Sequence, residues 1–152
     1  MAHLGRSRSD YGTLLLRLML GAFFIAHLGW KFFILKGGID GWWANLIKNG
    51  YAPYVPYYVF SVEVLGSLLL IPGILTRYVA LYAMPMMAGA AHYWLTRKGF
   101  YFTSAGCEMP LTWLVLLGIQ ALLGDGPYAL VRSPDFGALL ARFKRGQASA
   151  AQ

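Results

Sequence analysis

The chain has 152 residues, of which 58% are hydrophobic and only 12% are charged, about half the charged share of an ordinary soluble domain. A soluble fold of this length could not bury so much apolar surface, so we predict a single membrane domain over residues 1–152. The formal net charge of +7 does not indicate nucleic-acid binding, because Lys and Arg stand at the ends of apolar runs.

Four apolar runs predict an all-α fold, a bundle of four transmembrane helices. The runs cover residues 14–34, 54–75, 78–95 and 109–123. A helix needs about 20 residues to cross a hydrocarbon core of about 30 Å. The fourth run is short for a span, so we expect it to begin below the surface or to tilt little.

The connecting segments differ in character. A Gly- and Trp-rich stretch at 36–56 predicts a short interfacial segment after the first helix. The break at Thr76 and Arg77 is tight, so we expect the second and third helices to form an antiparallel hairpin. Small residues at Ala88 and Gly89 predict a face of the third helix that meets another helix. A polar, basic tail follows at 124–152.

The basic residues predict the orientation of the bundle. With both termini in the cytoplasm, eight Lys and Arg lie inside and five lie outside, which favours this topology. The inner set is Arg6, Arg8, Arg17, Arg77, Arg132, Arg142, Lys144 and Arg145, and the outer set is Lys31, Lys36, Lys48, Arg97 and Lys98. Arg17 and Arg77 lie near the inner boundary, where snorkelling to the headgroups accounts for them.

Few ionisable residues fall within the apolar runs, and such residues are costly in a membrane, so they are functional candidates. His27 lies roughly 10 Å below the outer end of its helix and Glu63 roughly 13 Å below the start of the next, at 1.5 Å per residue. His92 and Glu108 lie near the same side. We therefore expect Glu63 within side-chain reach of His27 or His92, in a cavity that passes protons to a quinone.

Each of these residues also has a simpler interpretation. Glu63 could cross-link neighbouring helices by a hydrogen bond or ion pair. With Lys31 four residues on, His27 could belong to a solvated stripe. His92 suits an interfacial position near a helix end, and Glu108 suits the dipole at a helix start.

Metal binding is a weaker alternative: two His and one or two Glu match a mixed nitrogen and oxygen ligand set, but no HxxxH or ExxH pair places two ligands on one helix. The outer side is rich in aromatic rings, which either form an interfacial belt or line a pocket for a planar ligand such as a quinone. These residues are Trp30, Trp42, Trp43, Tyr51, Tyr54, Tyr57, Tyr58, Tyr93, Trp94, Phe100, Tyr101 and Phe102. We take Trp30, Lys31, Tyr93 and Glu108 as candidate ligand-binding residues.

Four segments in order resemble the DoxX family over about residues 17–135. They read RLMLGAFFIAHLGWK, EVLGSLLLIPGILTR, MPMMAGAAHYW and GCEMPLTWLVLLGIQALLGDGPYALVRS. The resemblance implies a bacterial inner-membrane protein of four helices, with some members acting as subunits of thiosulfate:quinone oxidoreductase and others linked to thiol-redox complexes. Distant relatives use cysteine pairs, but this chain has only Cys107, so dithiol chemistry does not carry over.

Three classes of function remain open at this point. The chain could be an oxidoreductase subunit that exchanges protons and electrons with a quinone or a redox partner. It could be a non-catalytic scaffold that assembles partners or copies of itself, since no haem, flavin or iron–sulfur motif stores electrons here. It could also bind a small ligand or a metal in the membrane.

Overall fold

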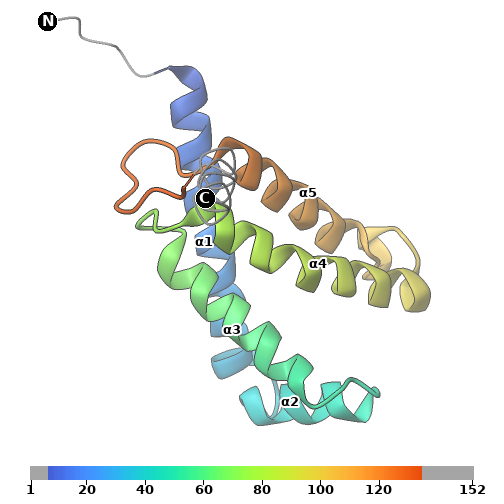
Figure 1. Ribbon diagram of the computed structural model, residues 1–152. Coiled ribbons are helices and arrows are strands. Elements are labelled where there is room, and N and C mark those ends of the chain that lie inside the picture. The colour runs from blue at the N-terminus through green and yellow to red at the C-terminus, as the bar shows by residue number, and fades with distance from the viewer. Residues whose placement is uncertain (1–6, 135–152) are drawn as a thin grey trace, which may run out of the picture.

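The computed structural model describes residues 7–134 and is all-α, with five α-helices in that part of the chain (Figure 1). The α-helices are α1 (Arg8–Gly29), α2 (Gly38–Lys48), α3 (Tyr54–Leu69), α4 (Thr76–Lys98) and α5 (Glu108–Leu123). A π-helix, η1 (Trp30–Ile34), continues α1, and a 3₁₀ turn, η2 (Phe102–Ser104), precedes α5. The predicted basic tail lies largely outside the described residues.

The helices pack as two antiparallel pairs. α1 lies along α3, and α4 lies along α5, which is the most extensive contact in the molecule. Figure 1 shows the two pairs diverging from a common end, with α2 across the far end of α3. The predicted hairpin of α3 and α4 exists, but it is a smaller contact than either pair.

The first helix is longer than its apolar run because its start is capped. The Ser7 hydroxyl accepts a hydrogen bond from the Asp10 backbone at 3.2 Å, and the Asp10 carboxylate accepts one from the Ser7 backbone at 2.8 Å. This capping box satisfies two donors that would otherwise be unpaired. α1 and η1 together run from Arg8 to Ile34, and in the described part only this helix is both long and apolar enough to cross a membrane.

The other helices meet the four-span expectation in part. α3 and α5 are apolar but have 16 residues each. α3 ends at Leu69, before the predicted end, because Pro72 and Gly73 form a turn in which Gly73 has φ of 76°. α4 then begins at Thr76 and reaches Lys98, past the predicted end of its apolar run.

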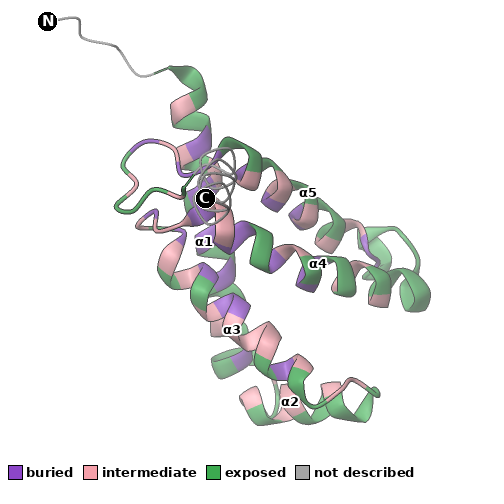
Figure 2. Cartoon of the chain, in the orientation of Figure 1, coloured by how far each residue is buried: buried purple, intermediate pink, exposed green. Residues whose placement is uncertain are grey.

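The core lies where the two pairs meet. Close approach of α1 and α3 depends on Gly66, where a Cβ atom would overlap the ring of Phe24. The buried apolar residues are Leu20, Phe24, Val62, Leu70, Val79, Ala80, Ala83, Met86, Met87, Trp113 and Leu117. Many apolar side chains face outward instead, and Figure 2 shows exposed positions along every helix. A chain of this size with so much exposed apolar surface is suited to lipid.

The predicted small-residue contact of the third helix is wrong in the single chain. Ala88 and Gly89 are exposed, and a Cβ atom on Gly89 would meet nothing within 4 Å. α4 buries Ala80, Ala83 and Met87 instead. These positions recur at three and four residues and form one face of the helix, whereas Ala88 and Gly89 lie on another.

Candidate functional site

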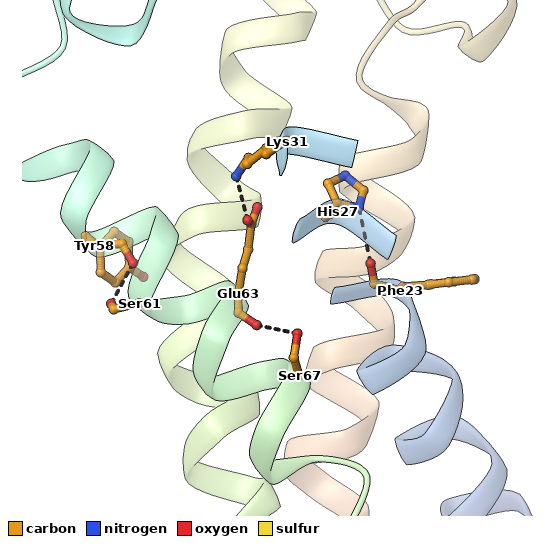
Figure 3. Close-up of polar contacts among 7 residues, drawn as sticks. All are labelled: Phe23, His27, Lys31, Tyr58, Ser61, Glu63 and Ser67. Atoms are coloured by element: carbon orange, nitrogen blue, oxygen red, sulfur yellow. Dashed lines mark hydrogen bonds and ion pairs between the residues drawn. The ribbon is translucent and has the colours of Figure 1, made fainter. Parts of the chain in front are cut away.

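A buried ion pair joins the two helices of the first pair. The Lys31 ammonium lies 2.5 Å from the Glu63 carboxylate, and both side chains are almost fully buried, at 3% and 4% exposure. Lys31 comes from η1 and Glu63 from the middle of α3, and Figure 3 shows the two side chains pointing toward one another. Removing one partner would leave an uncompensated charge, which typically costs about 3–5 kcal/mol.

An aromatic ring covers the cationic side of this pair. The Lys31 ammonium lies 3.7 Å from the centre of the Trp42 ring, within the range of a cation–π interaction. Trp42 belongs to α2. The next residue of that helix, Trp43, packs edge-on against Tyr57 of α3, with 4.4 Å between ring centres. The predicted interfacial segment is therefore a helix, and its Trp42 ring covers the Lys31 side of the ion pair.

Sequence spacing explains why Lys31 points inward. Buried residues of α1 recur at Arg17, Leu20 and Phe24, and Lys31 lies seven residues beyond Phe24, on the same face. The π-helical turn that holds it widens the end of the helix, a distortion that occurs frequently at functional sites. Sequence reasoning included Lys31 among ligand-binding candidates but did not identify it as the partner of Glu63.

His27 lies beside a different helix. Its ring packs edge-on against Trp113 of α5 at 5.0 Å, and its Nδ1 atom lies 3.4 Å from the Phe23 carbonyl oxygen. Trp113 also stacks on Phe23 at 5.2 Å. Figure 3 shows the imidazole directed toward α5, whereas Lys31 and Glu63 face each other. His27 thus contributes to the contact between α1 and α5.

The remaining candidates lie on both pairs: His92 and Tyr93 on α4, Glu108 at the start of α5, and Trp30 in η1, which continues α1. His92 is exposed on α4, and Trp30 is 42% exposed. The Tyr93 ring packs against the Tyr51 ring, with 5.9 Å between ring centres. The Arg97 guanidinium carbon lies 3.8 Å from the centre of the Tyr93 ring. These contacts link the end of α4 to the segment after α2.

Glu108 has a local partner. Its Oε2 atom accepts a hydrogen bond from the Phe102 backbone at 2.9 Å. The carboxylate therefore orders the loop before α5 at the start of that helix, in agreement with the simpler interpretation of this residue. A role of Glu108 in ligand binding, and a shared role of His27, His92 and Glu63, stay predictions.

A second buried polar cluster, the Asp125 network, lies at the opposite end of α1. It consists of Arg17, Thr76, Asp125 and Ser133. Arg17 is 1% exposed and donates from Nη1 to the Asp125 carbonyl at 2.6 Å, so it is buried in the fold and does not snorkel. The Asp125 carboxylate accepts from the Thr76 backbone and hydroxyl, both at 2.8 Å, and from the Ser133 backbone at 2.6 Å.

This network determines the protonation of Asp125. Burial by itself would raise the pKa of the carboxyl, but hydrogen bonds from Ser133 and Thr76 outweigh it and hold the pKa below its usual value. The carboxylate is therefore charged at neutral pH. Sequence reasoning missed the network because Asp125 stands in a Gly-rich turn, where Asp is ordinary.

Metal ligands do not gather in the described residues. Within 7–134 no group of three or more His, Cys, Asp or Glu side chains could hold a metal ion. Cys107 is buried beside the start of α5 and is a free thiol.

Comparison with known proteins identifies the family. The DoxX family model matches residues 12–98, which are more than half of the chain and include α2, α3, α4 and all but the first turn of α1. The chain belongs to the DoxX family. It is therefore an integral membrane protein, and the Lys31–Glu63 pair lies inside the matched DoxX region whereas α5 lies beyond it. No curated protein and no solved structure matches the chain.

Proposed function

We propose that this DoxX protein is a subunit of a quinone-linked redox system in the bacterial inner membrane, and that the Lys31–Glu63 pair exchanges protons at its site. The observation that carries the proposal is a charged pair almost fully buried in an apolar segment and covered by Trp42. Ionisable residues at such depth are costly and are characteristic of proton and ligand pathways.

The pair can hold one further proton. With Lys31 charged and Glu63 ionised, the two side chains sum to no net charge, and protonation of Glu63 leaves a single positive charge beside the Trp42 ring. Reduction of a quinone to a hydroquinone consumes two electrons and two protons. Glu63 supplies a proton and regains one from the aqueous side, while the electrons come from a redox partner protein.

The other candidates have supporting roles in this proposal. His27 is the second proton-carrying group, because a ring nitrogen of an imidazole can accept or donate a proton. Trp30 and Tyr93 provide flat rings for a planar head group, and His92 and Glu108 lie at the outer rim. The proposed topology has four spans with both termini cytoplasmic, in accordance with the eight inner and five outer Lys and Arg.

A non-catalytic scaffold is the second candidate. It is favoured by the completeness of the ion pair, because Lys31 and Glu63 satisfy each other and join α1 to α3 without a ligand. In that case the pair is a structural cross-link, and the exposed apolar faces serve assembly with a partner or a second copy.

Quinone binding separates the two candidates. The purified protein would be titrated with a short-chain quinone across pH, with quenching of tryptophan fluorescence as the readout, and its native quinone content measured by mass spectrometry. We expect Glu63→Gln to weaken binding and to flatten its pH dependence. Asp40→Asn, a carboxylate removed from the exposed side of α2, is the matched control. If folded Glu63→Gln binds quinone like the parent at every pH, the scaffold function replaces the redox one.

A further inference from the structure

Helix α2 is held differently from the other helices. None of its residues from Gly38 to Lys48 is buried, whereas every other α-helix of the described chain buries several residues (Figure 2). It contacts η1, which precedes it in the chain, and touches α3 to a smaller extent. A helix with few buried contacts can move at little cost in free energy, and the segments of proteins that move are drawn from such regions.

Two aromatic side chains of α2 hold it over the ion pair. The Trp42 ring lies directly against the Lys31 ammonium, 3.7 Å from ring centre to nitrogen. The Trp43 ring meets the Tyr57 ring, and Tyr57 is itself 67% exposed, so this contact lies at the surface. Moving α2 outward would therefore uncover the Lys31 side of the pair and leave the contact of α1 with α3 in place.

Glycines with left-handed backbone flank α2 at both ends. Gly37 and Gly38 have φ of 87° and 60° before its first turn, and Gly50 has φ of 84° after its last. Glycine adopts positive and negative φ about equally well, so such positions can absorb the backbone rotation of a hinge. Beyond Gly50 the chain is anchored again, because the Tyr51 ring packs against Tyr93 of α4. Each end of α2 therefore has a pivot with fixed chain on its far side.

We propose that α2 is a lid, which swings on Gly37–Gly38 and Gly50 to admit a planar ligand to the Lys31–Glu63 pair. The pair needs such a path, because its side chains are only 3% and 4% exposed when α2 is closed. In the open state the flat head group of a quinone replaces the Trp42 ring over the ammonium, which donates a hydrogen bond to a quinone carbonyl. The identity of this ligand rests on the proposed function, whereas the movement rests on the attachment of α2.

A reversible bridge between α2 and α3 tests the lid. In the full-length protein, Cys107→Ala removes the one native thiol, and Trp43→Cys with Tyr57→Cys places two thiols where the rings meet. A bifunctional methanethiosulfonate would bridge them, and a reductant would release the bridge. The readout is the rate at which a hydrophobic carbodiimide modifies Glu63, followed by peptide mass spectrometry. We expect bridging to slow modification by about tenfold and reduction to restore it, because the carboxyl reacts through the open state.

A hinge variant tests the pivot. Gly50→Ala adds a Cβ atom that meets nothing within 4 Å, but it strains the closed lid because φ is positive there. We expect Glu63 to be modified about fivefold faster, as the strain of one left-handed L-residue shifts the lid toward its open state. The matched control is Gly89→Ala, which adds the same methyl group to an exposed position of α4 with nothing within 4 Å. It should leave the rate unchanged.

Equal rates in the bridged and released protein would overturn the lid, as would equal rates in Gly50→Ala and Gly89→Ala. Binding of a short-chain quinone to the bridged and released protein separates this result from the proposed function. If the bridge slows modification of Glu63 but the released protein binds no quinone, the lid stands and the redox function fails. If both forms bind quinone equally fast, the redox function stands and the lid fails.

Discussion

The Lys31–Glu63 pair and the Asp125 network are both buried and charged, but they are built differently. In the pair, one ammonium and one carboxylate depend on each other, with the Trp42 ring as the additional contact. In the network, one carboxylate is held by two hydroxyl groups and two backbone N–H groups, and Arg17 binds the backbone carbonyl of the same residue.

This difference indicates different uses. A carboxylate held by many donors, including backbone that cannot move away, has a fixed protonation state and fixes the chain around it. It ties α1, the start of α4 and the segment after α5 together. A carboxylate with a single partner depends on that partner alone, so protonation of Glu63 would leave the Lys31 charge uncompensated and would couple the proton to the contact between the two helices.

The largest expected effect is the loss of one member of the pair. Glu63→Leu leaves Lys31 buried without its counter-charge and should destabilise the protein by about 3–5 kcal/mol. The double variant Lys31→Met/Glu63→Leu should recover most of that loss, because no unpaired charge remains. Unfolding in mixed detergent micelles would measure both. A double variant as unstable as the single one would show that the pair contributes packing more than charge balance.

Removal of the Asp125 carboxylate should have the next largest effect. Asp125→Ala leaves the Thr76 and Ser133 donors unsatisfied in a buried environment, at a cost of about 1–3 kcal/mol. Asp125→Asn keeps an acceptor oxygen and should lose less. The same unfolding assay applies, with Asp40→Asn as a control for charge removal alone. Equal losses in Asp125→Ala and Asp40→Asn would contradict a structural role for the network.

A smaller effect is expected from the aromatic cover. Trp42→Leu removes the cation–π contact with Lys31 and should cost about 1 kcal/mol. Trp42→Phe retains a ring face and should lose only part of this. A second readout is the rate at which a hydrophobic carbodiimide modifies Glu63, which should increase in Trp42→Leu as the cover is lost. An unchanged rate would mean that α2 does not shield the pair.

The smallest effect concerns pH. Because the folded-state pKa of Asp125 is lowered, its contribution to stability is complete above the unfolded-state pKa of about 3.9 and is lost as pH falls through the lower folded-state value. Stability of the parent should therefore decline as pH falls below about 4. Asp125→Asn should show a shallower decline, and parallel curves would contradict the contribution assigned to this carboxyl.

The fold class, the helix ends and Glu63 show which features could be predicted from the sequence. The all-α class follows from apolar runs interrupted by Gly, Pro and charge, since these patterns are local, and the family follows from the resemblance of four segments in order. Helix ends were displaced where a local contact extends or stops a helix, as with the Ser7 cap of α1 and the Pro72–Gly73 turn after α3. The sequence also placed Glu63 among the costly buried groups by its depth alone.

Only the tertiary structure decided which polar residues meet. The position of a residue along a helix axis follows from counting residues. The neighbour that its side chain meets depends on which helices pack together. Because α1 packs on α3, Glu63 pairs with Lys31. His27 instead packs against Trp113 of α5. The distant pairing of Arg17 with Asp125, 108 residues apart, depends on the same packing. The sequence by itself therefore determined the class of structure and the positions of its charges along the helices, and the packing of the two helix pairs determined their partners.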